Sequence, residues 1–176
     1  DSASRGLGDV YKRQYLLNKN KINCPETYIF RGQKAASGFI SNYNFKSRLI
    51  YKPLFGSQGD NIRLIERPSD LEKLENQTNI YYFQEYLDNS PNYDYRVLVI
   101  NNNDNIKYFY MTRYGETFIN NFSKGAKCIK EQLNEDVIEL AIRSSRLLNI
   151  DFCGVDIIEY KRCLLYTSDA ADERRR

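Results

Sequence analysis

The sequence of 176 residues contains no histidine. Without an imidazole there is no His-based zinc site, no serine or cysteine triad with a histidine base, and no histidine acid–base chemistry. The sequence also lacks an apolar run near the ~18 residues that a membrane helix needs, so we expect no membrane partner. These absences remove several classes of enzyme and the membrane-spanning class from consideration.

Neither sign of charge is in excess. The chain has 26 Lys and Arg against 23 Asp and Glu, a formal net charge of +3, and the basic residues are interspersed with acidic ones. A nucleic-acid-binding protein usually carries a basic stripe, so we expect no nucleic-acid partner.

Cysteine is scarce, and its spacing is unpaired. Between residues 15 and 162 the chain has Cys24, Cys128 and Cys153, an odd number with no paired spacing. Such usage indicates reduced thiols, and we expect a cytoplasmic protein.

Two terminal segments look unlike the rest of the chain. Residues 4–14 resemble an in-frame translation of a transposase sequencing adaptor, and residues 163–173 resemble the partner adaptor read from the other end. The alternative is that both are ordinary helix and strand ends. We expect residues 1–14 and 163–176 to be adaptor-derived and the natural chain to be longer on both sides.

Apolar periodicity, turn residues and caps predict a mixed fold. The pattern predicts strands over residues 27–30, 49–51, 62–65, 80–85, 93–100, 106–113 and 152–158, and a helix over 33–43. Ser69 and Glu72 fit a capping box for a short helix to about Glu75, and Asn134 fits the N-cap of a longer one. Residues 114–131 have no clean period. Strands, helices and antiparallel hairpins together indicate α+β or α/β layers.

A glycine-containing loop joins two of these predicted strands. Gly56 and Gly59 permit a tight turn with positive φ, and such a loop offers backbone N–H groups to phosphate oxygens. Lys52, just ahead of the loop, is a compact charge suited to phosphates. The loop is not a P-loop, because Asp60 and Asn61 follow Gly59 where that motif has Lys-Ser/Thr. Taken alone, these features more often mark an ordinary hairpin.

Four further segments follow in a fixed order: Phe83–Leu87, Tyr93–Ile100, Asn120–Gly125 and Cys153–Ile158. In this order and spacing the set resembles the ATP-grasp superfamily, and most closely the ribosomal-protein glutamate ligase type, from about Tyr15 to Arg162. The resemblance implies an α+β fold of two small lobes that hold ATP between them. The first lobe is expected over residues 15–87, and an incomplete second lobe over residues 88–162.

The resemblance also implies roles for individual residues. The nucleotide-contacting positions are Lys52 at the α- and β-phosphates, Gly56, Ser57, Gln58 and Gly59 in the loop over them, Gln84, Glu85 and Tyr86 at the adenine edge, Asp94 at the ribose, and Asn120 and Asn121. Arg113 falls at the catalytic arginine near the γ-phosphate, and Asp156 at the ligand of Mg²⁺ or Mn²⁺. Its usual companion, a Glu-x-Asn on the next strand, should come shortly after Arg162.

Plainer roles are open for the same residues. Lys52 can be an exposed strand lysine, Gln84 to Leu87 an ordinary edge strand, and Arg113 a solvated surface residue. Arg96 can be the salt-bridge partner of Asp94. Asp156 lies between apolar neighbours on a strand that should be buried, so it needs either a metal or a lysine or arginine from a neighbouring strand.

The activity that the resemblance implies is an ATP-dependent carboxylate–amine ligase. ATP would phosphorylate a carboxylate of a small molecule or a protein tail, and an amine such as that of glutamate would attack the acylphosphate. Ile119 replaces an arginine usual in the ribosomal-protein type, which leaves the acceptor open. A nucleotide-binding module without ligase activity is the alternative. We expect the chain as given to lack turnover, because the Glu-x-Asn strand is not in it.

Overall fold

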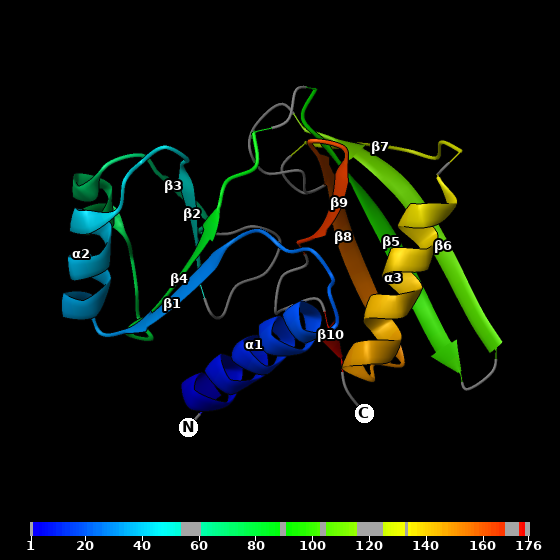
Figure 1. The fold of residues 1–176 in the computed structure, drawn as a ribbon, viewed down its shortest axis with the longest axis horizontal. Helices are drawn as coiled ribbons and strands as arrows, with labels where there is room; N and C mark the ends of the chain where they lie inside the picture. Colours follow the sequence, from blue (N-terminus) through cyan, green and yellow to red (C-terminus); the bar gives the residue numbers. More distant parts are fainter. Residues whose placement is uncertain are drawn as a thin grey trace. The chain divides into compact units, whose positions relative to one another are not determined.

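The computed structural model describes residues 2–53, 61–88, 91–102, 105–115, 125–132, 134–167 and 173–174. The chain divides into two compact units (Figure 1). Unit 1 comprises Asp1–Asp9 and Pro25–Leu87, and unit 2 comprises Val10–Cys24 and Asp88–Arg176.

Unit 1 contains a four-stranded antiparallel sheet in the order β1-β4-β2-β3. Its elements are β1 (Thr27–Arg31), α2 (Gln33–Asn42), β2 (Leu49–Lys52), β3 (Arg63–Ile65), the 3₁₀ helix η1 (Pro68–Lys73) and β4 (Ile80–Glu85). β2 and β3 confirm the two strands on either side of the predicted glycine-containing loop, and residues 54–60 between them lie outside the described residues.

The core of unit 1 lies between this sheet and α2. Leu49 and Tyr51 alternate with half-buried residues along β2 and pack with Ala36 and Ile40 of α2. Phe83 is fully buried at the centre of an aromatic group. The helix predicted over residues 33–43 is confirmed as Gln33–Asn42, and it buries Ala36 and Ile40.

The predicted capping box is wrong. η1 is a 3₁₀ helix whose N-cap position, Arg67, makes no side-chain cap hydrogen bond. Pro68 begins it and has no N–H that needs a cap. The acidic side chain that serves this end is Asp70, which accepts a hydrogen bond from the backbone N–H of Glu66 at 3.1 Å.

Unit 2 contains a second antiparallel sheet, with the order β10-β8-β5-β6-β7 and with β9 paired to β8. The strands are β5 (Tyr93–Asn102), β6 (Asn105–Tyr114), β7 (Lys127–Ile129), β8 (Phe152–Tyr160), β9 (Cys163–Tyr166) and β10 (Glu173–Arg174). β5, β6 and β8 confirm predicted strands. β7 was not predicted, because its three exposed residues carry no alternation.

The core of unit 2 lies on one face of that sheet, under α3 (Glu135–Leu148). Val97 and Val99 of β5 pack with Val137 and Ala141 of α3, and Leu17 joins them from α1 (Ser2–Lys19). α3 begins as predicted. Asn134 accepts a hydrogen bond from the N–H of Asp136 at 3.1 Å, and Asn149 ends the helix in the left-handed conformation.

Parts of both terminal segments adopt regular structure. α1 runs without interruption from Ser2 to Lys19, and β9 places the buried side chain of Tyr166 in the core of unit 2. The strand position beside β8, where the resemblance implies Glu-x-Asn, is thus filled by Cys163–Tyr166. Whether these residues are native stays a prediction. Within the described residues, no helix is long and apolar enough to cross a membrane.

Candidate functional site

Two arginines and two aspartates lie on the sheet face of unit 2 that is opposite to α3. Val97 and Val99 face α3, so Asp94 and Arg96, which alternate with them on β5, face the other way. In the strand register Asp94 is the partner of Arg113 on β6, and Arg96 is the partner of Asp156 on β8. Directly opposed residues on one face are close enough to pair, so the strand register brings these four charged side chains together.

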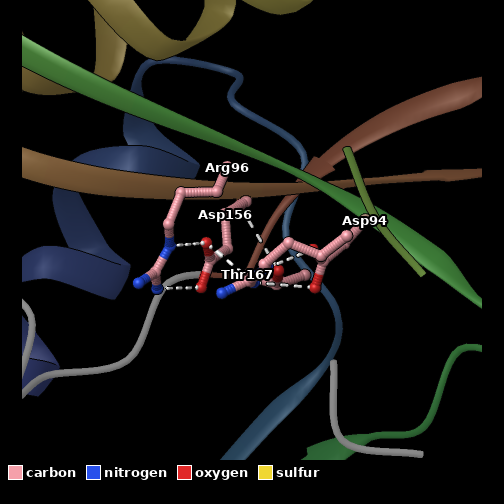
Figure 2. Close-up of polar contacts among 5 residues, drawn as sticks. Asp94, Arg96, Asp156 and Thr167 are labelled. Carbon is pink, nitrogen blue, oxygen red and sulfur yellow. Dashed lines mark hydrogen bonds and ion pairs between the residues drawn. The ribbon is translucent and has the colours of Figure 1, made fainter. Parts of the chain in front are cut away.

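Both register pairs are bidentate ion pairs (Figure 2). Arg96 donates from Nε to Oδ1 of Asp156 and from Nη2 to Oδ2, each at 2.7 Å. Arg113 donates from Nε to Oδ1 of Asp94 at 2.7 Å and from Nη2 to Oδ2 at 2.8 Å. The Nη2 group of Arg113 also lies 2.9 Å from Oδ1 of Asp156. Arg113 therefore bridges the two carboxylates.

Burial and charge act against each other in this cluster. Burial raises the pKa of the Asp94 carboxyl to about 6, although the Arg113 guanidinium opposes the rise. Burial also works to raise the pKa of Asp156, but Arg113 and Arg96 together outweigh it and hold that pKa below its usual value. For Arg113, burial works to lower the pKa, and the two carboxylates reverse this and raise it.

Backbone features position the Asp156 end of the cluster. Gly154, on the same face of β8, lies beside the Arg96 guanidinium, and a Cβ there would be in ordinary van der Waals contact with Cζ of Arg96 at 3.8 Å. Thr167, which follows β9, donates its backbone N–H to the carbonyl oxygen of Asp156 at 2.8 Å and its hydroxyl to the same oxygen at 3.3 Å.

The remaining described candidates belong to unit 1. Lys52 is half-buried and lies opposite Tyr82 in the register, on the sheet face opposite to the Tyr51 and Phe83 core. Gln84 shares that face and is buried. Its Nε2 donates to Oγ1 of Thr27 at 3.2 Å and to the Tyr82 hydroxyl at 3.3 Å.

The predicted adenine segment is already tied to unit 1 through its amides. The N–H of Glu85 donates to the carbonyl of Glu26, and the N–H of Tyr86 donates to the carbonyl of Arg48, both at 2.8 Å. The Arg48 guanidinium lies over the Tyr86 ring, 4.7 Å from its centroid. Recognition of a base here would therefore use other groups of the segment, such as its carbonyl oxygens.

The structure separates the candidates into three sets. Arg113, Asp94 and Asp156 are brought together in unit 2, and Lys52, Gln84, Glu85 and Tyr86 lie in unit 1. Gly56, Ser57, Gln58, Gly59, Asn120 and Asn121 lie outside the described residues.

The structure settles the alternative roles of Arg113, Asp156 and Asp94 that the sequence left open. Arg113 is 4% exposed, so it is not a solvated surface residue. Asp156 has the arginine partner from a neighbouring strand that the sequence left open. Asp94 pairs with Arg113, whereas Arg96 pairs with Asp156.

The described residues do not by themselves fit a magnesium ion. Asp156 offers hard carboxylate oxygens of the kind that Mg²⁺ prefers. Both oxygens, however, already accept hydrogen bonds from guanidinium groups. The described part of the chain contains no group of three His, Cys, Asp or Glu side chains able to hold a metal.

Sequence reasoning did not find the pairing of Arg96 with Asp156 or the contact from Thr167. The first had a signal, since Arg96 and Asp156 each interrupt an apolar strand and opposite charges in such strands can pair across a sheet. The second had none, because Thr167 falls in the segment expected to be adaptor-derived.

Comparison with solved structures defines the class of fold. An ATP-grasp ligase of Chryseobacterium gregarium, associated with ribosomally synthesised peptides and solved with ADP and leader and core peptides, matches with a TM-score of 0.66. The sequence identity is 16%, over 98% of this chain and 55% of that one. The chain therefore has an ATP-grasp fold of α+β type.

Comparison with family models assigns the chain to one family within the ATP-grasp fold. The model of the RimK-like ATP-grasp domain matches residues 8–171, and the chain belongs to this family. It is 31% identical to a probable alpha-L-glutamate ligase of Haemophilus influenzae over 89% of this chain and 53% of the relative. It is 28% identical to a tetrahydromethanopterin:alpha-L-glutamate ligase of Methanosarcina acetivorans, over 89% and 52%. The chain thus spans about half the length of these relatives.

Proposed function

We propose that this chain is the nucleotide-binding part of an ATP-dependent ligase that joins a carboxylate to an amine. The observation that carries the proposal is membership of the RimK-like ATP-grasp family over residues 8–171, with relatives named glutamate ligases. The proposed cofactors are ATP and Mg²⁺ or Mn²⁺. The proposed substrates are a carboxylate, on a small molecule or a protein tail, and an amino-acid amine such as that of glutamate.

The reaction has two displacements. A carboxylate oxygen bonds to the γ-phosphorus of ATP while the bond to the bridging oxygen breaks, which releases ADP and leaves an acylphosphate. The amine nitrogen then bonds to the acyl carbon, phosphate departs, and the ammonium proton passes to solvent. Catalysis of such steps is mostly positioning and charge neutralisation, because a carboxylate must approach a polyphosphate of the same sign.

The chain offers cations for both tasks. We assign Lys52 to the α- and β-phosphates, since it lies half-buried at the end of β2, just ahead of residues 54–60, where the sequence predicts the glycine-containing loop. We assign Arg113 to the transferring phosphoryl group. The rigid bidentate pair with Asp94 fixes the direction of its guanidinium, and a group held in place needs little reorganisation during reaction.

Asp94 can serve a ribose without leaving Arg113. A carboxylate has about four lone-pair sites, and the bidentate pair with Arg113 occupies two of them. A ribose hydroxyl could therefore donate to a site that remains. Base recognition is assigned to Gln84, Glu85 and Tyr86, phosphate contacts to the loop from Gly56 to Gly59, and a further nucleotide contact to Asn120 and Asn121. These assignments follow the family resemblance.

ADP release tests the proposal. We would measure it with ATP, Mg²⁺, a panel of carboxylates and a panel of amines, on this chain and on a chain extended to the length of the relatives. We expect the extended chain to need both a carboxylate and an amine for turnover, and this chain to bind an ATP analogue without turnover. If the extended chain bound ATP but released no ADP with any pair, the nucleotide-binding module would replace the ligase.

A further inference from the structure

The sheet of unit 2 carries large apolar side chains on the face opposite to α3, next to the ion pairs. Since Asp94 and Arg96 of β5 lie on this face, the alternation along the strand places Leu98 and Ile100 on it as well. The register adds the directly opposed residues of β6 and β8. We call the resulting group the apolar strip, and its members are Leu98, Ile100, Phe109, Met111 and Phe152.

The apolar strip is exposed, unlike the opposite face of the same sheet. Phe109 is 61% exposed and Phe152 is 48% exposed, whereas Val97 and Val99 are fully buried in the core under α3. An antiparallel sheet with one face on its core usually carries polar residues on the other face, and a contiguous exposed apolar patch often marks a binding surface. Packing within unit 2 therefore does not account for the strip.

The size of the apolar strip fits a small molecule better than a second protein. It spans β6, β5 and β8, and it runs from the row of Arg96 to the row of Ile100. At the usual spacing and rise of strands it covers about 10 Å by 13 Å. That footprint, on the order of 130 Å², is far below the ~800 Å² per partner of a stable protein–protein interface. One aromatic ring or a short alkyl chain covers such an area.

The apolar strip also continues directly from the ion pairs. Along this face of β8 the residues are Phe152, Gly154 and Asp156 in order, so only a glycine separates the strip from the ion pairs. On β6, Phe109 lies four residues before Arg113, about 13 Å along the strand. Arg113 is the residue assigned above to the transferring phosphoryl group. A carboxylate that receives this group at Arg113 can place the rest of its molecule on the strip.

We propose that the apolar strip binds the body of the acceptor substrate, and that the acceptor is a carboxylic acid with an aromatic ring or alkyl group about 7–13 Å from its carboxylate. The range is the length of strand from Arg113 to Met111 at the near end of the strip and to Phe109 farther along. The inference rests on the proposed function, which places the carboxylate at Arg113. It favours an aromatic or aliphatic acid over a polar protein tail.

Binding of two matched carboxylates to this chain tests the strip without nucleotide or turnover. The probes are 6-phenylhexanoate and 6-hydroxyhexanoate, which share a carboxylate and five methylene groups and differ only at the far end. We would titrate each into the ¹⁵N-labelled chain and fit the shifts of the amide signals. We expect 6-phenylhexanoate to bind about tenfold more tightly, as for removal of roughly 60 Å² of apolar surface from water. The largest shifts should be at Leu98, Phe109 and Phe152.

Substitutions on the two faces of the sheet locate the binding. Phe109→Ser should remove most of the advantage of 6-phenylhexanoate, and Phe152→Ser should reduce it independently. Tyr108→Ser is the matched control, because Tyr108 is the next residue on β6, is 42% exposed and lies on the other face. Equal affinity of the two probes for the unaltered chain would overturn the proposal. So would an advantage that survives both phenylalanine substitutions.

A second copy of the chain is the rival occupant of the strip. In analytical ultracentrifugation, self-association of the unaltered chain that Phe109→Ser abolishes would assign the strip to that copy and overturn the acceptor proposal. A single monomeric species for both chains is the expected result.

Turnover by the extended chain separates this inference from the ligase proposal. Phe109→Ser should raise the KM for the carboxylate that supports the fastest ADP release, and it should leave the KM for ATP unchanged. If ADP release continues with neither KM changed, the ligase stands and the acceptor proposal fails. If 6-phenylhexanoate binds the strip but no pair of substrates releases ADP, the ligase fails, and with it the acceptor role.

Discussion

The two sheets of this molecule are stabilised in different ways. The sheet of unit 1 packs an aromatic cluster against α2, with Phe39 and Phe83 each contacting several other rings. The sheet of unit 2 has an aliphatic core under α3 and, on its opposite face, the ion pairs of Asp94, Arg96, Arg113 and Asp156.

The difference concerns how each unit responds to its surroundings. Burial of apolar area is non-directional and changes little with pH. A buried network of ion pairs is favourable only as a complete set, because each partner removed leaves a charge without compensation. Unit 1 should therefore respond to volume, and unit 2 to charge, pH and salt.

Phe83→Ala should have the largest effect on stability. Phe83 is fully buried among Phe30, Phe39, Tyr51 and Tyr81, so truncation leaves a cavity and should lower the free energy of unfolding by about 3–5 kcal/mol. Urea unfolding followed by circular dichroism measures it, and the loss should be the same at pH 5 and pH 7. A loss below about 1 kcal/mol would show that this packing is not central.

Arg113→Ala should cost about 3 kcal/mol at pH 7, the low end for a broken buried ion pair, because Arg96 still neutralises Asp156. Unlike Phe83→Ala, it should cost less at pH 5, where Asp94 can take up a proton. Arg146→Ala, exposed on α3, is the matched control. A loss that does not depend on pH would contradict the charge explanation.

The pH dependence of stability should have opposite signs in the two units. Asp94 has a folded pKa near 6 against an ordinary value of 3.8, so its contribution is full below about pH 4 and is lost as the pH rises through about 6. At about 1.4 kcal/mol per pKa unit, the loss is at most about 3 kcal/mol. For Asp70 in unit 1, a hydrogen bond from Lys73 lowers the pKa, so its contribution is lost on acidification instead.

Urea unfolding between pH 2 and pH 7 separates these signs, because Asp94 titrates near pH 6 and Asp70 titrates below its ordinary value of 3.8. The stability deficit of Asp94→Asn relative to the unaltered chain should shrink as the pH rises, whereas that of Asp70→Asn should grow. Parallel curves for Asp94→Asn and the unaltered chain would mean that Asp94 does not titrate in this range.

Asn134→Ala should have a smaller effect, because it removes one helix cap. The side chain of Asn134 satisfies the N–H of Asp136, and loss of such a cap costs about 1 kcal/mol. Gln132→Ala, exposed just before the helix, is the control. In unit 1, α2 begins after Gly32 without a side-chain cap, so no substitution there can remove a comparable hydrogen bond. Amide exchange in the first turn of α3 should quicken only in Asn134→Ala.

Lys52→Ala should change stability least and ligand binding most. Lys52 is half-buried on the face opposite to the aromatic core, so we expect a change in unfolding free energy within about 0.5 kcal/mol. Loss of the proposed phosphate contact should weaken binding of an ATP analogue by about tenfold, the equivalent of about 1.4 kcal/mol. Titration calorimetry with Lys34→Ala as control decides it. Unchanged affinity would return Lys52 to an ordinary strand lysine.

Most of the fold could be predicted from local patterns. The alternation of buried and half-buried residues in β2 and in the middle of β5, and the cap at Asn134, each depend on a few neighbouring residues, so the sequence reveals them. β7 and η1 could not be read in this way. β7 has three exposed residues and exists because β6 offers it an edge, and η1 takes its form from Pro68 and Asp70 together.

The candidate site, like the fold, could be predicted only where it depends on neighbouring residues in the sequence. That Asp156 is buried and needs a partner follows from its apolar neighbours, and the structure confirms both points. Which arginine meets which aspartate depends on the register of three strands, and a shift by one residue would turn every one of these side chains to the other face. The spacing of Asp94 and Arg96 in the sequence does not determine that register.

The two ion pairs also close chain loops of very different length. Asp94 and Arg113 are 19 residues apart and meet when the β5–β6 hairpin forms, whereas Arg96 and Asp156 are 60 residues apart and meet only after β8 joins β5. Short loops cost less entropy to close. In stopped-flow refolding, changes at Arg113 should therefore slow folding, and changes at Arg96 should mainly speed unfolding. The reverse pattern would mean that β8 docks first. If the expected pattern holds, the ion pair of Arg113 with Asp94 forms early, within the hairpin, and the ion pair of Arg96 with Asp156 is among the last contacts that the sheet of unit 2 makes.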